Sequence, residues 1–241
     1  PGDSRPGGRV SEEGRVFLPD SGIIGFSRHF RTVPRGDPAC NDPRSAVITR
    51  RVDSNPSFLR PTPAEFFDRL VSGLSDSGYA SFPGLFSEGF VRSVRDEMES
   101  LRSDGAFRPA GIGRGEAVRS PGTRGDGIWW FGSEGDSPVR AEIGEFLESV
   151  RRNLNESLYL GLWDWEGHYS IYPSGTFYRK HLDRFSGDSR RAVSTVFYFN
   201  PDWNESDGGV LRIETANGTV EVPPSGGTAI FFLSDRIPHE V

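Results

Sequence analysis

The sequence is poor in cysteine and lysine, and the shortage of cysteine limits how the chain can be stabilised. Cys40 is the only cysteine among 241 residues, so no disulfide can form within the chain. Lys180 is the only lysine among 28 basic residues. Such cysteine usage is compatible with a reducing compartment, and we expect a cytoplasmic protein.

Long apolar runs and a surplus of basic residues are also missing. The longest apolar run of interest, residues 229–233, has five residues, whereas a membrane helix needs roughly 20. The net charge is −6, and a general nucleic-acid binder would need a basic face to neutralise phosphates. We therefore expect a globular monomer that binds neither membranes nor nucleic acid.

Composition divides the chain into two parts. Residues 1–61 hold 10 arginines against 7 acidic residues, and proline and glycine supply 15 of these positions. A compact core is unfavourable at that composition. We expect a mostly irregular N-terminal extension over 1–61, on which short apolar islands such as residues 23–26 could dock, and one domain over 62–241.

Residues 62–241 show signals of helices first and of strands afterwards. Thr62-Pro-Ala-Glu65 is a capping box with proline at the first helical position, and further helices are predicted from Ser87 and from Ser137. Strands are predicted around 168–172, 177–183, 192–199, 209–214, 219–222 and 228–233, with a further strand from His239. This order predicts an α+β domain, with a jelly-roll-like barrel packed on N-terminal helices.

A glycine-rich stretch at 111–125 precedes the aromatic residues 128–131. A phosphate-binding loop would end in Gly-Lys-Ser/Thr and lead directly into a helix, and this stretch does neither. We expect a mobile loop.

His181 and Asp183 are the first candidate metal ligands. In a strand over 177–183, both side chains would project from the same face. His239 follows 56 residues after Asp183, which is enough chain for several strands to run and return. Two imidazoles and one carboxylate with an open side suit Fe(II) that must also bind a cosubstrate and oxygen. A His-x-Asp motif alone is weak, because chance gives one in about one such sequence in four.

Further motifs make this pattern more specific. In chain order they are Tyr172-Pro-x-Gly-x-x-Tyr178-x-x-His181-x-Asp183, Phe197-Tyr-Phe-Asn-x-Asp-Trp203, Gly208-Gly-x-Leu211-Arg212 and Phe231-Phe-x-Ser-Asp-Arg-x-Pro-His239-Glu-Val241. Together they resemble the oxygen-sensing prolyl 4-hydroxylases of animals and their bacterial and protist relatives. The resemblance covers roughly residues 62 to 241, and its motifs are dense only from residue 167 onward.

The resemblance implies an Fe(II)- and 2-oxoglutarate-dependent dioxygenase built on a double-stranded β-helix. His181, Asp183 and His239 would hold the iron. Such enzymes use O2 and ascorbate and couple the decarboxylation of 2-oxoglutarate to the hydroxylation of proline in a protein or peptide. The loop at 111–125 would then close over the substrate. A non-catalytic metal-binding β-barrel module, or a dioxygenase with a non-prolyl substrate, is the alternative.

The resemblance also assigns residues around the iron. Tyr198 would meet the distal carboxylate of 2-oxoglutarate, and Leu211 would form an apolar wall of its pocket. Tyr172 and Tyr178 match two further site tyrosines, although each tyrosine taken alone fits a core role better, because aromatic residues of strands usually pack. On the substrate side the assigned residues are Asp126, Arg191 and Trp130. Asp126 and Arg191 would pair with each other, or form a merely solvated ion pair.

His168 is a further candidate residue of the site, and one arginine of the family has no counterpart in the given chain. His168 would share a strand face with Ser170 and Tyr172, which makes it a candidate for the pocket lining. A fourth metal ligand is disfavoured, because a closed site would block oxygen chemistry. The family holds the 2-oxoglutarate carboxylate with an arginine on the strand after the second histidine. The given chain stops two residues after His239, so we expect the last barrel strand to be truncated.

Overall fold

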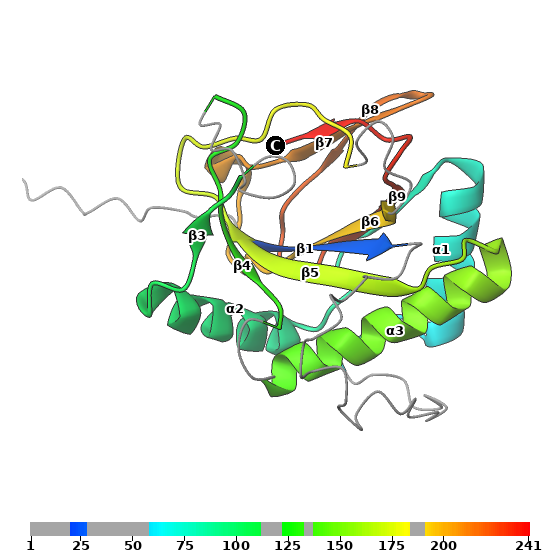
Figure 1. Ribbon diagram of the computed structural model, residues 1–241, viewed down its shortest axis with the longest axis horizontal. Helices are drawn as coiled ribbons and strands as arrows, with labels where there is room; N and C mark the ends of the chain where they lie inside the picture. Colours follow the sequence, from blue (N-terminus) through cyan, green and yellow to red (C-terminus); the bar gives the residue numbers. More distant parts are fainter. Residues whose placement is uncertain (1–19, 28–57, 112–121, 133–136, 184–190) are drawn as a thin grey trace, which may run out of the picture.

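The structure is a computed structural model that describes residues 20–27, 58–111, 122–132, 137–183 and 191–241. Two antiparallel sheets and three α-helices form this part of the chain (Figure 1). The helices are α1 (Pro63–Asp76), α2 (Glu88–Ser103) and α3 (Pro138–Leu158). The strands are β1 (Asp20–Ser27), β2 (Tyr79–Phe82), β3 (Arg108–Pro109), β4 (Gly127–Trp130), β5 (Asp164–Ile171), β6 (Arg191–Tyr198), β7 (Leu211–Thr215), β8 (Gly218–Val222), β9 (Ala229–Leu233) and β10 (His239–Glu240). The predicted α+β class is confirmed.

The three helices begin where the sequence predicts them. The Thr62 side chain accepts from the backbone of Glu65, and the Glu65 side chain accepts from the Thr62 backbone, which completes the capping box of α1. Ser87 and Ser137 cap α2 and α3 in the same way with their hydroxyls. None of the helices in the described ranges is long and apolar enough to cross a bilayer.

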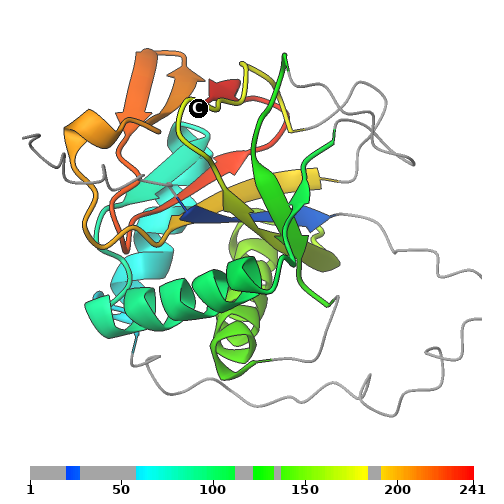
Figure 2. The same ribbon diagram turned by 90° about the vertical axis from the view of Figure 1, so that its left-hand side faces the viewer.

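The strands form a large sheet and a small one that face each other. The large sheet has the order β2-β9-β6-β1-β5-β4-β3, and the small sheet has the order β10-β7-β8. Figure 2 shows the helices on one side of the large sheet and the small sheet on the other. The chain after residue 190 therefore contributes strands to both sheets, β6 and β9 to the large one and β7, β8 and β10 to the small one.

The N-terminal part differs from expectation at two places. Residues 20–27 were expected in an irregular extension, but they form β1, which pairs antiparallel with both β5 and β6. Phe58 and Leu59 are also buried in the core. The physical reason is that β5 and β6 do not pair directly, so their backbone groups need a strand between them. The rest of 1–57 lies outside the described residues.

The expected strand over 177–183 is also not regular. Tyr178 and His181 each form an isolated antiparallel bridge, with Arg124 and His239 respectively. Gly175 has a positive φ of 78° in the turn just before, and the segment then alternates between two different partners instead of following one strand. The predicted strands around 209–214 and 219–222 form the antiparallel pair β7–β8.

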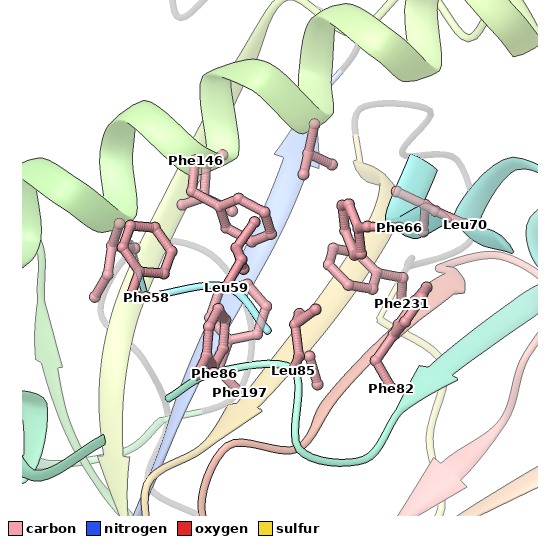
Figure 3. Close-up of a cluster of buried hydrophobic side chains, with 14 of the residues drawn as sticks. Phe58, Leu59, Phe66, Leu70, Phe82, Leu85, Phe86, Phe146, Phe197 and Phe231 are labelled. Atoms are coloured by element: carbon pink, nitrogen blue, oxygen red, sulfur yellow. The ribbon is translucent and has the colours of Figure 1, made fainter. Parts of the chain in front are cut away.

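Hydrophobic side chains pack on both faces of the large sheet. Phe231 of β9 points to the helices and contacts Phe66 of α1 and Phe197 of β6, as Figure 3 shows. Its neighbours Ile230 and Phe232 point to the opposite side, because successive side chains of a strand alternate. A second apolar cluster therefore lies between the sheets, and it includes Val196, Tyr198, Leu211, Ile213, Ile230 and Phe232.

Candidate metal centre

His181, Asp183 and His239 form the one group of three potential metal ligands found among the described residues. One ligand atom from each of them lies within 4.8 Å of the others. His181 Nε2 is 3.5 Å and His239 Nε2 is 3.7 Å from Asp183 Oδ1. The backbone fixes this arrangement, because His181 and His239 exchange two N–H···O bonds of 3.0 Å. The structure thus brings together all three predicted ligands.

The two imidazoles are oriented by backbone carbonyls. Nδ1 of His181 lies 2.8 Å from the carbonyl of Arg179, and Nδ1 of His239 lies 3.1 Å from the carbonyl of Ile237. A carbonyl only accepts, so each Nδ1 carries the proton and each Nε2 keeps a free lone pair. Both Nε2 atoms are on the side of Asp183. This tautomer is the one that binds a metal.

The charges around Asp183 favour the metal-binding protonation states. Burial alone would raise the pKa of Asp183, but the neighbouring His181 and His239 rings, Arg191 and Ser194 hold it well below its usual range. Burial lowers the pKa of His239. At neutral pH the group therefore offers a carboxylate and a neutral imidazole. Such a donor set fits Fe(II).

A stack of side chains supports His181 from the side opposite the backbone. The Tyr178 ring lies on the His181 ring, with centroids 3.6 Å apart and planes 19° apart. The Arg124 guanidinium lies over the Tyr178 ring, 4.3 Å from its centroid. Arg124 in turn forms a two-pronged ion pair with Asp126, at 2.7 and 2.5 Å, and the Asp126 side chain is fully buried.

The expected pair between Asp126 and Arg191 is therefore wrong. Asp126 is held by Arg124, only two residues earlier on the same loop. Arg191 instead contacts Glu166 and lies 3.8 Å from Asp183. Glu166 is on β5 and Arg191 begins β6, and β1 is the single strand between them, so the long arginine side chain can reach across. Arg191 thus faces the ligand group rather than the loop acid.

The residues predicted for the 2-oxoglutarate pocket lie between the sheets. Tyr198 and Leu211 are buried in the same cluster. Tyr172 is buried near Asp126 and Tyr198, and burial raises its pKa. Burial also raises the pKa of Tyr198, so its hydroxyl keeps the proton that it would donate to a carboxylate. Trp130, predicted for the substrate side, is partly exposed and touches His168 with ring centroids 4.6 Å apart.

Sequence reasoning missed Arg124 and Ser194. Both contact a predicted site residue, Asp126 and Asp183 respectively. The available signal for Arg124 was its place two residues before a predicted site acid. Ser194 carried no signal beyond its place in a strand. Of the expected lid, residues 112–121 lie outside the described residues.

His168 makes stability depend on acid in a measurable way. Burial, and then the positive charges of Arg124 and Arg191, lower the pKa of His168 to about 3. The unfolded chain therefore takes up a proton near pH 6.5, whereas the folded chain does so only near pH 3. This contribution to stability is complete above pH 6.5 and is lost as the pH falls towards 3.

We expect the His168→Gln variant to lose less stability in acid than the wild type does. The difference between the two free energies of unfolding should change by about 3 kcal/mol between pH 6.5 and pH 4. Urea titrations at several pH values measure it. A difference that stays constant with pH would contradict the buried neutral state of His168.

Comparisons with known proteins agree with this geometry. The model of the 2OG-Fe(II) oxygenase superfamily matches residues 167–241. Prolyl hydroxylase EGLN3 of Mus musculus is 31% identical over 188 residues, which cover 71% of this chain and 75% of the mouse protein. The chain belongs to the prolyl hydroxylase family of these oxygenases. Hypoxia-inducible factor prolyl hydroxylase of Caenorhabditis elegans is 27% identical over 187 residues. These residues cover 72% of this chain but only 26% of the nematode protein.

Solved structures of this family share the fold. A prolyl-4-hydroxylase of Pseudomonas putida is 36% identical with a TM-score of 0.67, and the match covers 73% of this chain and 91% of the bacterial one. A prolyl hydroxylase of Trichoplax adhaerens, solved with a peptide of hypoxia-inducible factor, is 26% identical with a TM-score of 0.66, over 73% and 82% of the two chains. The two facing sheets are therefore the double-stranded β-helix of these oxygenases.

Proposed function

We propose that this chain hydroxylates proline in a protein or peptide, with Fe(II), 2-oxoglutarate and O2. The observation that carries the proposal is the group of His181, Asp183 and His239, whose two Nε2 lone pairs and one carboxylate converge. Family membership gives this donor set its chemistry. The relatives named above are prolyl hydroxylases, which is why proline is the proposed target.

The residues of the chain divide the work between holding and orienting. His181, Asp183 and His239 would hold Fe(II), which with 2-oxoglutarate and O2 supplies the oxidising power for inserting oxygen into a C–H bond, while succinate and CO2 are released. The Tyr198 hydroxyl would donate to the distal carboxylate of 2-oxoglutarate. Leu211 would exclude water from this pocket, which strengthens the hydrogen bond by lowering the local dielectric.

The substrate would approach from the side of Trp130. This side chain is 43% exposed although it lies beside the buried His168. An exposed aromatic ring beside His168 would offer an apolar surface for a proline ring. Arg191, partly exposed and 3.8 Å from Asp183, would face a peptide carbonyl at the same entrance.

Succinate release tests the proposal directly. The full-length protein should form succinate from 2-oxoglutarate with Fe(II) and ascorbate, and a proline-bearing protein substrate should stimulate the reaction. Mass spectrometry of a lysate treated with the enzyme should show one added oxygen on proline. The His181→Ala variant should form no succinate. Metal binding without any succinate formation would instead favour the non-catalytic module, and oxygen added to another residue would overturn the prolyl assignment.

We expect the Tyr198→Phe variant to bind 2-oxoglutarate about tenfold more weakly, because one hydrogen bond to a charged group is lost. The ring would still fill its place in the apolar cluster, so folding should not change. The KM for 2-oxoglutarate measures the effect, and the affinity for Mn(II) alone is the control. An unchanged KM would show that Tyr198 is only a core residue.

A further inference from the structure

The Nε2 atom of His168 is buried and has no hydrogen-bond partner among the described residues. The side chain as a whole is 8% exposed. A buried polar atom without a partner is costly, so native structures rarely keep one unless a ligand or a water completes it. His168 is not part of the metal group, and no step proposed above uses it.

The strand pattern places His168 on the pocket side of the large sheet. Its neighbour Tyr169 packs into the core under the helices, next to Trp129. Side chains alternate along a strand, so His168 and Ser170 point to the opposite side, between the sheets. Trp130 lies against the His168 ring and limits the directions that the ring can take.

The register places His168 between the metal group and Tyr198. Through β1, His168 is level with Val196 on β6. Ser194, two residues along β6 in one direction, lies close enough to Asp183 to lower its pKa. Tyr198 is two residues along β6 in the other direction. Each of these steps is about 7 Å. A five-carbon dicarboxylate reaching from the metal towards Tyr198 would pass this level of the sheet.

The surroundings of His168 favour an anionic partner. Arg124 and Arg191 both lie near enough for their charges to oppose protonation of the ring, and burial opposes it more strongly. The imidazole is therefore neutral at neutral pH, with one N–H to donate. Asp183 opposes these two arginines, and both arginines are also paired with carboxylates, so it is the N–H donor that suits a carboxylate or a keto oxygen as the acceptor.

We propose that His168 is a cosubstrate-binding residue, whose Nε2–H donates to an oxygen of the anionic 2-oxo acid bound between the metal group and Tyr198. This inference rests on the proposed function. It adds a polar contact midway along the ligand, where Val196, at the same level two strands away in the same sheet, offers only an apolar side chain. Removing the donor should weaken binding of the 2-oxo acid without changing binding of the metal.

Isothermal titration of the full-length protein tests the inference without turnover. The protein is loaded with Mn(II) in place of Fe(II) and titrated with 2-oxoglutarate. We expect His168→Met to bind 2-oxoglutarate about ten- to a hundredfold more weakly than the wild type, because a donor to a charged group is lost. His168→Gln keeps an N–H and should recover much of the affinity. Binding of Mn(II) should be the same in all three.

Tyr169→Phe is the matched control. It lies on the same strand, points to the opposite face, and also loses a buried polar atom that has no partner among the described residues. Its affinity for 2-oxoglutarate should equal that of the wild type. If His168→Met proves unstable in thermal melting, His168→Leu repeats the test.

The outcomes separate this inference from the proposed function. If the wild type binds Mn(II) and 2-oxoglutarate and His168→Met binds 2-oxoglutarate equally well, His168 holds only a water and the inference is overturned. In that case the proposed function stands. If the wild type binds Mn(II) but no 2-oxoglutarate, the proposed function fails and the inference fails with it.

Discussion

Replacing Asp183 by asparagine should lower the affinity for Fe(II) or Mn(II) by more than about a hundredfold and abolish succinate formation. Loss of a partner that merely orients a ligand costs about 10–100-fold in metal affinity, and Asp183 is itself the anionic ligand. The amide would also leave Arg191 at 3.8 Å from the site without the negative charge that it now faces. A divalent cation would then meet the charge of Arg191, which keeps Glu166 as an ion-pair partner, with one carboxylate fewer to offset it.

The matched control for Asp183→Asn is Glu221→Gln. It makes the same change from carboxylate to amide, but on an exposed residue of β8 that pairs with Arg212. Calorimetric titration with Mn(II) should show that this control binds the metal with wild-type affinity. Circular dichroism should show that both variants are folded. Metal binding by Asp183→Asn within about tenfold of the wild type would contradict the assignment of Asp183 as a ligand.

The elements with local signals could be predicted from the sequence. Thr62, Ser87 and Ser137 each precede a helical pattern and cap a helix in the structure. His181 and His239 could be identified because motifs around each of them restrict their place in the fold. Local hydrogen bonds decide the caps and the motifs decide the ligands, and a sequence displays both directly.

The long-range pairings could not be predicted in the same way. Residues 20–27 lie in a segment rich in glycine and proline, and only the space between β5 and β6 makes a strand of them. The predicted partner of Asp126 was also wrong, because two arginines lie within reach of the site and composition does not indicate which of them pairs with Asp126. Competition between a local partner such as Arg124 and a distant one such as Arg191 is settled by packing of the whole sheet.

The second large effect is expected from Arg124. Its guanidinium neutralises Asp126, whose side chain is fully buried, and the two groups form a bidentate pair. Removing one partner of a buried pair leaves an uncompensated charge, which costs about 3–5 kcal/mol. Arg124→Ala should therefore lower the free energy of unfolding by about that amount. Ser170 offers Asp126 only a long hydrogen bond of 3.4 Å in compensation.

Arg124 should also affect the metal centre, through Tyr178. The guanidinium lies over the Tyr178 ring, and this ring stacks on His181. A double variant, Arg124→Met with Asp126→Leu, separates the two effects, because it removes both charges while keeping apolar volume. We expect it to recover most of the stability lost in Arg124→Ala, as replaced buried ion pairs often do. Its Mn(II) affinity should remain severalfold below that of the wild type, because Tyr178 still lacks its cation. If the double variant binds Mn(II) as the wild type does, Arg124 stabilises the fold without positioning His181.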